Sequence, residues 1–488
     1  MKRREFIKSA AAAGAAPLLF NGCATGFVAN RKVNVGVIGY GRIASTFEVP
    51  HVLKRPDLAR IVAICDLDRK RAHFGRLTVE HAYNDGAKVA VYTDYKELCA
   101  REDIDAVMIC LPDFWHALVA TTAICSGKAV WLQKPFTQTI AEGRLLANLA
   151  KKYGTVMQVG SQQRSWNQFQ AVCAAVQAGV LGDVKRVEVG IGLDRAGGNR
   201  WAEPVPATFD YETWLGPTDH DVPYNWTRCH NDDLRHIADR PGWIQLAPYG
   251  WGMITNWGAH HLDIAQWGLD MDESGPVKAI CSDEPHSTDL YHGGRRQYGM
   301  KMIFKKPYGD VELYHGPFGV WGTVFYGTDG IVAVNRGKIA VWKGTGLVKP
   351  TKEIRKALEN ASFMSDKIVA VSIGEDYGTD ATVKKDTGLD AAINKLNKQF
   401  DLASAKVQLY KSPNQVQNFC ECIETRKMTI SPAEVGARGA VLCQICNMSY
   451  VYDSGFDWNP KSFTFANGTG DESWLKRPYY RNGWNIVV

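Results

Sequence analysis

The stretch VNVGVIGYGRIAS, residues 33–45, decides the fold that the sequence predicts. Its apolar run is followed by the spacing G-x-G-x-x-A at Gly39, Gly41 and Ala44, where a strand would pass into a helix. Gly39 permits a tight turn, Gly41 lets a pyrophosphate approach the backbone, and Ala44 lets helix and strand pack closely. Because any tight turn favours glycine, it is the strand before and the helix after that make this a predicted dinucleotide site.

The residues around this turn extend the predicted dinucleotide site. Arg42 and Ile43 open the helix, whose free backbone N–H groups would face the phosphates. Asp66 ends the second predicted strand, where an acid hydrogen-bonds the adenosine ribose hydroxyls, and this favours NAD. Arg69 and Lys70 lie nearby and could instead hold a 2′-phosphate, so NADP stays open.

Short apolar strands alternate with helices over residues 33–161. This alternation predicts an α/β fold, a Rossmann domain with a doubly wound parallel sheet, which we place at residues 31–162. The following residues, 163–488, show strand-like alternation with Gly-rich turns, which predicts an α+β domain with a large open, mainly antiparallel sheet. Within that domain, the polar stretch at about 347–409 is expected to be a surface insertion, partly helical.

The first 30 residues are predicted to be an export signal rather than part of the fold. Arg3 and Arg4 precede a short apolar run, which is typical of a twin-arginine signal. Cys23 follows Gly22 as at a lipoprotein cleavage site. We therefore expect a periplasmic protein, exported by the twin-arginine route, whose membrane contact would be limited to a lipid on Cys23.

Charge and cysteine content exclude two other classes of function. Half of the formal net charge of +6 lies in the export signal, and no long basic run remains, which disfavours nucleic-acid binding. The pairs Cys420-x-Cys422 and Cys443-x-x-Cys446 have the spacing of metal ligands. Both pairs fall on or near the apolar faces of predicted amphipathic helices, so we expect core cysteines and no metal site.

Lys134 lies directly after the fifth predicted strand, in AVWLQKP. Ligands of open parallel sheets bind beyond the carboxyl ends of the strands, so this lysine should face the same crevice as the glycine turn. It could bind the nicotinamide ribose and a substrate hydroxyl, or it could only order the loop. Leu111, Pro112 and His116 occupy the corresponding place after the fourth strand, although His116 could equally make a structural hydrogen bond.

These features, with the segments LPDFWH, QKP, TNWGAHHLDIAQWG and LKRPYYRNGW, resemble the Gfo/Idh/MocA family of glucose–fructose oxidoreductase and inositol dehydrogenase. The likeness is greatest to the larger exported bacterial members. It implies a two-domain fold, a bound nicotinamide cofactor, sugar or polyol substrates and a homo-oligomer. The family's lysine motif usually reads Glu-Lys-Pro, and here Gln133 stands in place of the acid, beside the predicted cofactor.

The resemblance also implies a second motif, formed by Asn256 and His260 one helical turn apart. His260 matches the family's general acid/base, and Asn256 stands where the family usually has an aspartate, so it can position a hydroxyl but cannot accept a proton. A helix N-cap and a packed histidine are the alternative interpretations. Gln163 and Arg164 match residues at the boundary of cofactor and substrate, and His261 is a weaker substrate candidate.

We therefore expect an exported NAD(P)-dependent oxidoreductase, a dehydrogenase acting on a hydroxyl of a sugar or glycoside. Outside the cytoplasm there is no ready pool of nicotinamide cofactor, so the cofactor would be tightly bound and recycled in place. Two alternatives stay open. One is a glycosidase that uses NAD for transient oxidation and elimination. The other is a non-catalytic sugar-binding protein, because Gln133 and Asn256 both depart from the motifs.

Overall fold

The computed structural model describes most of the chain after residue 31. The described residues are 32–191, 201–218, 223–229, 233–281, 300–316, 322–336, 338–346, 348, 352, 368–372, 393–394, 407, 409–412, 414–477, 480–484 and 486. The predicted export signal, including Cys23, lies outside them, as does most of the predicted insertion at 347–409. Within this part of the chain, no helix has both the length and the apolar character that crossing a bilayer requires.

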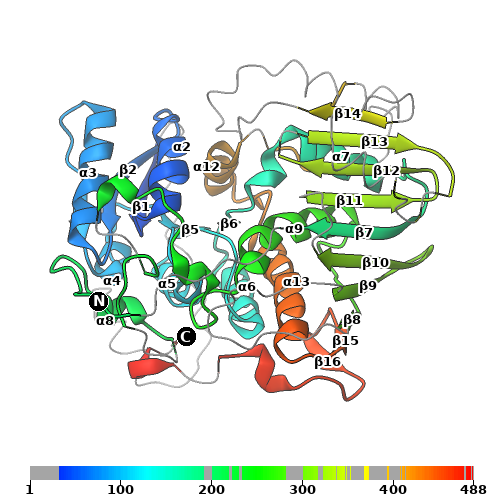
Figure 1. Cartoon of the computed structure of the whole chain (residues 1–488). Coiled ribbons are helices and arrows are strands. Elements are labelled where there is room, and N and C mark those ends of the chain that lie inside the picture. Colours follow the sequence, from blue (N-terminus) through cyan, green and yellow to red (C-terminus); the bar gives the residue numbers. More distant parts are fainter. Residues whose placement is uncertain are drawn as a thin grey trace. The chain divides into compact units, whose positions relative to one another are not determined.

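The first sheet has six parallel strands in the order β3-β2-β1-β4-β5-β6, which confirms the predicted Rossmann sheet (Figure 1). The chain moves outward on one side of β1 and then returns to build the other side. The carboxyl ends of β1 and β4 therefore diverge into a crevice, the usual ligand site of such sheets. The strands are β1 Val33–Ile38, β2 Ala59–Cys65, β3 Ala90–Tyr92, β4 Ala106–Ile109, β5 Ala129–Leu132 and β6 Met157–Val159.

The helices that connect these strands begin and end at recognisable caps. The side chain of Asp68 accepts a hydrogen bond from the backbone of Lys70 and starts α3. Thr139 and Glu142 form a reciprocal capping box at the start of α6, and Gly154 ends that helix with a φ of 60°. The connecting helices are η1 Ala44–Glu48, α2 Val49–Leu53, α3 Arg69–Tyr83, α4 Tyr95–Cys99, α5 His116–Cys125 and α6 Ile140–Tyr153.

The second sheet has ten strands among the described residues. Every neighbouring pair is antiparallel except β7 and β10, which confirms the predicted large, mainly antiparallel sheet. Its order is β14-β13-β12-β11-β7-β10-β9-β8-β15-β16. The edge strand β14 falls inside the predicted insertion. The strands are β7 Val184–Gly190, β8 Lys278–Ile280, β9 Met300–Lys306, β10 Gly309–Gly316, β11 Gly322–Gly327, β12 Gly330–Asn335, β13 Lys338–Lys343, β14 Ile368–Ser372, β15 Phe456–Asn459 and β16 Thr464–Ala466.

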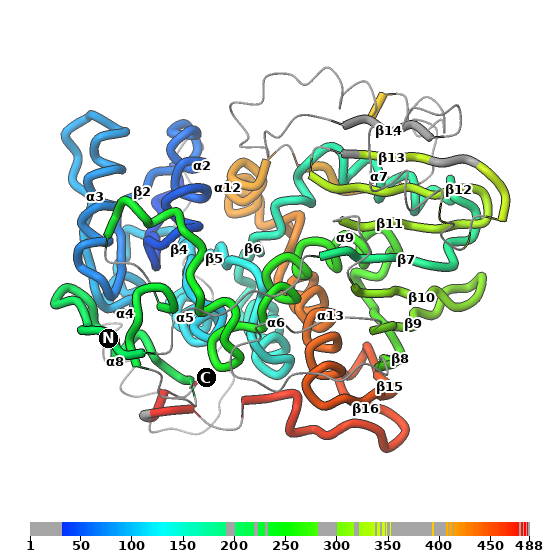
Figure 2. The backbone as a smooth tube through the Cα atoms, viewed as in Figure 1, coloured from blue at the N-terminus to red at the C-terminus, as the bar shows by residue number. Residues whose placement is uncertain are grey.

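Helices pack between the two sheets and join them. In Figures 1 and 2, α13 (Ala433–Val451) lies between α6 and the strands β8 and β9, and it contacts all three. Helices α7 (Asn167–Gln177) and α9 (Ala259–Gly268) pack together against the second sheet. The predicted domain boundary near residue 162 therefore falls just after β6, inside one continuous set of contacts, and remains a prediction.

The four cysteines with metal-ligand spacing are buried in helices, as expected for core residues. They lie on α12 (Gln415–Thr425) and on α13. Loss of hydration raises the pKa of the Cys446 thiol, so it stays protonated. Among the described residues, no cluster of histidine, cysteine or acidic side chains has a metal-binding arrangement.

Candidate active site

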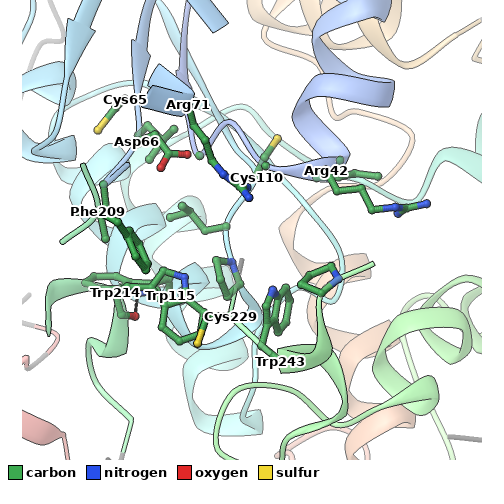
Figure 3. Close-up of a pocket in the computed structure, with 18 of the residues that line it drawn as sticks. Arg42, Cys65, Asp66, Arg71, Cys110, Trp115, Phe209, Trp214, Cys229 and Trp243 are labelled. Carbon is green, nitrogen blue, oxygen red and sulfur yellow. Dashed lines mark hydrogen bonds between the residues drawn. The ribbon is translucent and has the colours of Figure 1, made fainter. Parts of the chain in front are cut away.

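A cavity of about 690 Å³ lies beyond the carboxyl ends of the parallel strands (Figure 3). The turns after β1, β2, β4 and β5 line one side, and segments from the second half of the chain line the other. This is the place where the sequence predicted a dinucleotide. The predicted residues that line it are Gly39, Gly41, Arg42, Ile43, Asp66, Leu111, Pro112, Gln133, Lys134 and Asn256.

The glycine turn leaves room for a bulky ligand at one position and not at the other. Gly39 has a φ of 88°, and a Cβ atom built there would lie 2.6 Å from the carbonyl oxygen of Cys110. A Cβ atom on Gly41 would meet only Nη1 of Arg71, at 3.6 Å. Gly39 therefore closes the turn, and Gly41 keeps its backbone open toward the cavity, as a bound pyrophosphate requires.

Asp66 and Arg71 give the glycine-turn end of the cavity its charge. The carboxylate of Asp66 accepts hydrogen bonds from the backbone nitrogens of Tyr40, at 2.7 Å, and Asp68, at 2.8 Å. It thereby fixes the turn after β1 to the turn after β2. The side chain of Arg71 reaches from α3 into the centre of the cavity (Figure 3). A guanidinium there suits an anionic phosphate, and the sequence interpretation did not single it out.

A segment from the second half of the chain covers the cavity, and we call residues 207–218, 223–229 and 233–243 the covering segment. At one rim, the backbone of Arg69 donates to the carbonyl oxygen of Thr208 at 2.9 Å. At the other, Nε of Arg42 donates to the carbonyl oxygen of Ala238 at 2.8 Å. Bonds to both rims span the crevice, so a ligand within it would be enclosed.

Aromatic side chains fill the space between the covering segment and the parallel sheet. The indole nitrogen of Trp115 donates to the carbonyl oxygen of Trp214 at 3.0 Å, and Phe209 and Trp243 also line the cavity. Figure 3 shows Trp115, Trp214 and Phe209 grouped on one side. Trp484 packs edge-on against Trp115, so the last described segment reaches this region.

Lys134 follows β5, and the strands β1 and β4 separate it from β2, which Asp66 follows. Its Nζ donates a hydrogen bond of 2.9 Å to the carbonyl oxygen of Asn256. Loss of hydration lowers the pKa of Lys134 to about 7; the charge of Asp113 opposes this, and arginines that include Arg336 and Arg240 reinforce it. An amine that exchanges its proton near neutrality suits acid–base chemistry on a hydroxyl.

Asp113 is a cavity residue that the sequence interpretation missed. It follows Pro112 after β4, inside the quoted segment LPDFWH, and its side chain is buried. Thr255 donates a hydrogen bond of 3.4 Å to its Oδ2 atom. Burial raises the pKa of Asp113 to about 7, against the opposing charge of Lys134. Its place after a parallel strand was the available signal, because the same rule selected Leu111.

Gln133, which replaces the family's usual acid, lies against another carboxylate. Its Nε2 atom donates to Oε1 of Glu48, a buried residue at the end of η1. Nε2 of Gln162 donates to the same oxygen at 3.3 Å. An acid at position 133 would meet Glu48 as a like charge, so glutamine at this position fits the carboxylate on η1.

The histidines predicted after Asn256 do not line the cavity. His260 and His261 are buried on α9, and both pack against the ring of Trp257. Loss of hydration lowers the pKa of His260 well below its ordinary value, and the charges of Lys134 and Arg336 add to this. His260 is therefore a neutral imidazole one turn behind the cavity-lining residue Asn256, and His261 is held in the core.

Two other predicted residues take structural places. His116 contacts the carbonyl oxygens of Pro135, at 2.7 Å, and Leu111, at 3.0 Å, so it joins two cavity loops and does not line the cavity. Gln163 accepts a hydrogen bond of 3.1 Å from Arg336 and lies outside the cavity lining. His116 and Gln163 therefore position loops and do not face the cavity in which a cofactor would lie.

Arg164 is buried in ion pairs, contrary to the predicted substrate contact. Its guanidinium donates to both carboxylate oxygens of Asp263, at 2.7 and 2.8 Å, and to both of Asp272, at 2.7 and 2.8 Å. It also lies 5.0 Å from the ring centroid of Trp267. With its donors used in the interior and only 1% of its surface exposed, it cannot reach a ligand in the cavity.

Two models of one protein family match this chain. Residues 33–161 match the oxidoreductase family with an NAD-binding Rossmann fold, and residues 175–301 match the C-terminal α/β domain of the same family. The chain belongs to the Gfo/Idh/MocA oxidoreductase family. The family match covers β1, the glycine turn and Lys134 in its first part, and Asn256 and His260 in its second.

Individual relatives match mainly over the Rossmann part. The uncharacterized oxidoreductase YdgJ of Escherichia coli is 32% identical over 32% of this chain and 42% of its own length. Inositol 2-dehydrogenase 1 of Saccharopolyspora erythraea is 31% identical over 31% of this chain and 43% of its own. A glycosyl hydrolase family 109 protein of Streptomyces niveus is 31% identical over 32% of each chain. The chain thus spans less than half the length of these curated Gfo/Idh/MocA relatives.

A solved structure extends the likeness to the whole Gfo/Idh/MocA fold. Levoglucosan dehydrogenase, solved with NADH and levoglucosan, superposes with a TM-score of 0.52 over 88% of this chain and 99% of that one. The two sequences are 15% identical. At that identity the similarity establishes a shared fold of two sheets, and the chemistry must be argued from this chain's own residues.

Proposed function

We propose that the protein is an NAD-dependent oxidoreductase that acts on a hydroxyl group of a sugar or glycoside. One observation carries the proposal: one cavity is lined by Asp66 beyond β2, by the glycine turn beyond β1 and by Lys134 beyond β5, with β1 and β4 between the outer two. A nicotinamide dinucleotide is long enough to need all three. The names of its relatives, an inositol dehydrogenase and a levoglucosan dehydrogenase, support a polyol or sugar as the substrate class.

These residues have distinct tasks in this proposal. The glycine turn, Arg42 and Arg71 would hold the pyrophosphate, and Asp66 the adenosine ribose. When bound, the nicotinamide supplies the hydride chemistry. Lys134 Nζ would bind the substrate hydroxyl and take up its proton, since this amine lines the cavity and His260 does not.

NAD is preferred over NADP in this proposal because of Asp66. Its carboxylate lines the cavity and would repel a 2′-phosphate. Of the cations that kept NADP open, Lys70 does not line the cavity. Arg69 does, but its Nη2 atom donates to the carbonyl oxygen of Ala207 at 3.2 Å, which directs it toward the covering segment.

The covering segment supports a cofactor that stays bound between turnovers. Hydrogen bonds to Arg69 and Arg42 hold it across both rims, so release would require it to open. Such retention suits an exported enzyme that recycles its cofactor in place, as the predicted twin-arginine signal of residues 1–30 requires. Fractionation of cells carrying the full chain, with and without Arg3→Lys and Arg4→Lys, tests the periplasmic location. Light scattering on the same protein tests the expected homo-oligomer.

The proposal is tested first by mass spectrometry of small molecules released from the purified, undialysed protein. NAD at close to one equivalent is expected; release of no dinucleotide by a folded protein would overturn the proposal. Turnover is then followed with sugars, polyols and aryl glycosides. A ketone product with an added hydride acceptor supports the dehydrogenase. Release of an aglycone without net redox change would instead favour the glycosidase suggested by the family 109 relative.

A further inference from the structure

The chain lacks a carboxylate at both positions where its family usually has one, yet its cavity contains carboxylates elsewhere. Gln133 and Asn256 are amides and cannot balance the charge of Lys134. Among the described residues, the acidic residues that line the cavity are all aspartates, and each has different partners. They are Asp66, Asp94, Asp113, Asp210 and Asp239.

Four of these aspartates are engaged away from Lys134. Asp66 accepts from two backbone nitrogens. Asp94 and Asp210 are N-caps that accept from the backbone of α4 and α8 (Tyr211–Leu215) respectively. Asp239 is exposed and contacts the ring of His236 at 2.9 Å. Asp113 remains: it follows β4, which pairs with the strand that Lys134 follows, and it is the charge that acts most strongly on Lys134.

Asp113 and Lys134 are held in a common frame. Thr255 donates to Oδ2 of Asp113 at 3.4 Å, and the carbonyl oxygen of the next residue, Asn256, accepts from Nζ of Lys134 at 2.9 Å. Thr255 and Asn256 both belong to η6 (Ile254–Gly258), the first turns of the helix that continues as α9. The side chain of Thr255 is fully buried, so this frame does not depend on solvent.

We propose that Asp113 is the charge partner that positions a proton on Lys134, replacing the carboxylates that Gln133 and Asn256 have lost. Oxidation of an alcohol to a ketone removes a hydride from carbon and a proton from oxygen. A nicotinamide held in this cavity would supply the hydride acceptor, and this inference, which rests on the proposed function, assigns the proton to Nζ of Lys134. The ammonium then formed is stabilised by the carboxylate of Asp113 until the proton leaves to solvent.

The charges around Lys134 explain why the partner is needed. Arg336, Arg240 and Arg42 all act on this amine from other elements and favour its neutral form. His260 and His116 face the same amine and are themselves kept neutral by it and by burial. Asp113 is the largest charge acting on Lys134 and opposes these arginines, so its loss would leave the ammonium facing mainly cations.

The test is the protonation of Lys134 itself, which does not require turnover. The full-length protein is labelled with trace acetic anhydride over a range of pH, and the acetylation of Lys134 is measured by peptide mass spectrometry against exposed Lys152. Since only the neutral amine reacts, the profile reports its titration. In the wild type, the midpoint is expected near pH 7. In Asp113→Asn it is expected to fall by about 1–3 pH units, because an ammonium loses its opposite charge.

Asp239→Asn is the matched control, because it removes a cavity carboxylate that contacts His236 and is not among the main charges acting on Lys134. Its midpoint should equal that of the wild type, and Asp113→Glu should recover most of the shift. An unchanged midpoint in Asp113→Asn, or a wild-type midpoint near the ordinary lysine value of 10.5, would overturn the inference. If Asp113→Asn does not fold, Asp113→Ser, which also removes the charge, is titrated in its place with the same expected and overturning results. Absence of dinucleotide would remove the proposed function and leave this titration result standing.

Discussion

The Nζ atom of Lys134 donates a hydrogen bond of 2.9 Å to the carbonyl oxygen of Asn256, which lies 122 positions later in the chain. This contact joins the turn after β5 of the parallel sheet to the first turns of the helix that packs on the antiparallel sheet. The acceptor is a backbone oxygen, so the bond survives any substitution of the Asn256 side chain. The two motif positions are therefore brought together by the backbone, and each side chain is left to contact a ligand.

Lys134→Met should abolish most turnover without releasing the cofactor. A positioned acid–base group contributes about 100- to 10,000-fold, so we expect a loss of kcat/KM in that range. His260→Gln should lose about tenfold or less, because His260 does not line the cavity. Mass spectrometry of the released dinucleotide serves as the control for folding. A larger loss of kcat/KM in the histidine variant than in the lysine variant would show that His260, and not Lys134, is the acid–base group.

Removal of the charge on Asp66 should change which dinucleotide binds. Asp66→Asn keeps an oxygen for only one of the two backbone N–H donors, because Tyr40 and Asp68 bind different oxygens, and it gives up the charge-assisted bond to the ribose, worth about 1.5–3 kcal/mol. We therefore expect NAD to bind about 10- to 100-fold more weakly, with NADP gaining relative to NAD. Quenching of tryptophan fluorescence on titration with each nucleotide measures both. Equal weakening of NAD and NADP would show that Asp66 serves only the backbone.

The covering segment should set the rate at which the cofactor leaves. Phe209→Ala removes an aromatic side chain from the cavity lining and should speed release of the cofactor, measured as exchange of bound for isotopically labelled NAD. A tenfold increase corresponds to about 1.4 kcal/mol and is the size we expect. Trp201→Ala is the matched control, because this tryptophan is 63% exposed and lies outside the cavity lining. Equal release rates in the two variants would argue against the covering role.

Arg164 should matter for stability rather than for substrate. Arg164→Met leaves Asp263 buried without its partner, and loss of one member of a buried pair costs about 3–5 kcal/mol of the free energy of unfolding. Urea denaturation measures this cost. Arg101→Met, which breaks a surface pair with Asp103, should change stability by less than about 1 kcal/mol. A folded Arg164→Met protein with wild-type stability and a raised KM would instead support the predicted contact between Arg164 and the substrate.

His315 should make the fold sensitive to acid. It is buried beside Tyr450, and loss of hydration lowers its pKa from 6.5 to about 4. The unfolded state therefore binds the proton more readily. The contribution of His315 to the free energy of unfolding is fully present above pH 6.5 and is lost as the pH falls below that value. Between pH 7.5 and 5 this one group should remove about 2 kcal/mol. His315→Gln should flatten the pH dependence of the free energy of unfolding by that amount, and an unchanged slope would contradict the assignment.

Much of the fold could be predicted from local sequence because strands, turns and caps are local. The glycine spacing, the alternation over residues 33–161 and the position of Lys134 after an apolar run each depend on neighbouring residues. Their periodicity and turn chemistry are set by backbone sterics, which act over a few positions. The family motifs located Asn256 and His260 on one helix for the same reason.

The tertiary structure alone decided which of these residues share the cavity. Asp113 and Lys134 are separated by a helix and a strand, and the frame that holds them comes from Thr255 and Asn256, far away in sequence. Arginine is a residue type that often binds ligands, yet Arg164 is buried in ion pairs with residues far away in sequence. The sequence by itself determined the elements and the turn that opens to a dinucleotide. The assignment of charges to the cavity required the packed chain, because hydration and electrostatic contacts depend on distances in space that no local pattern encodes.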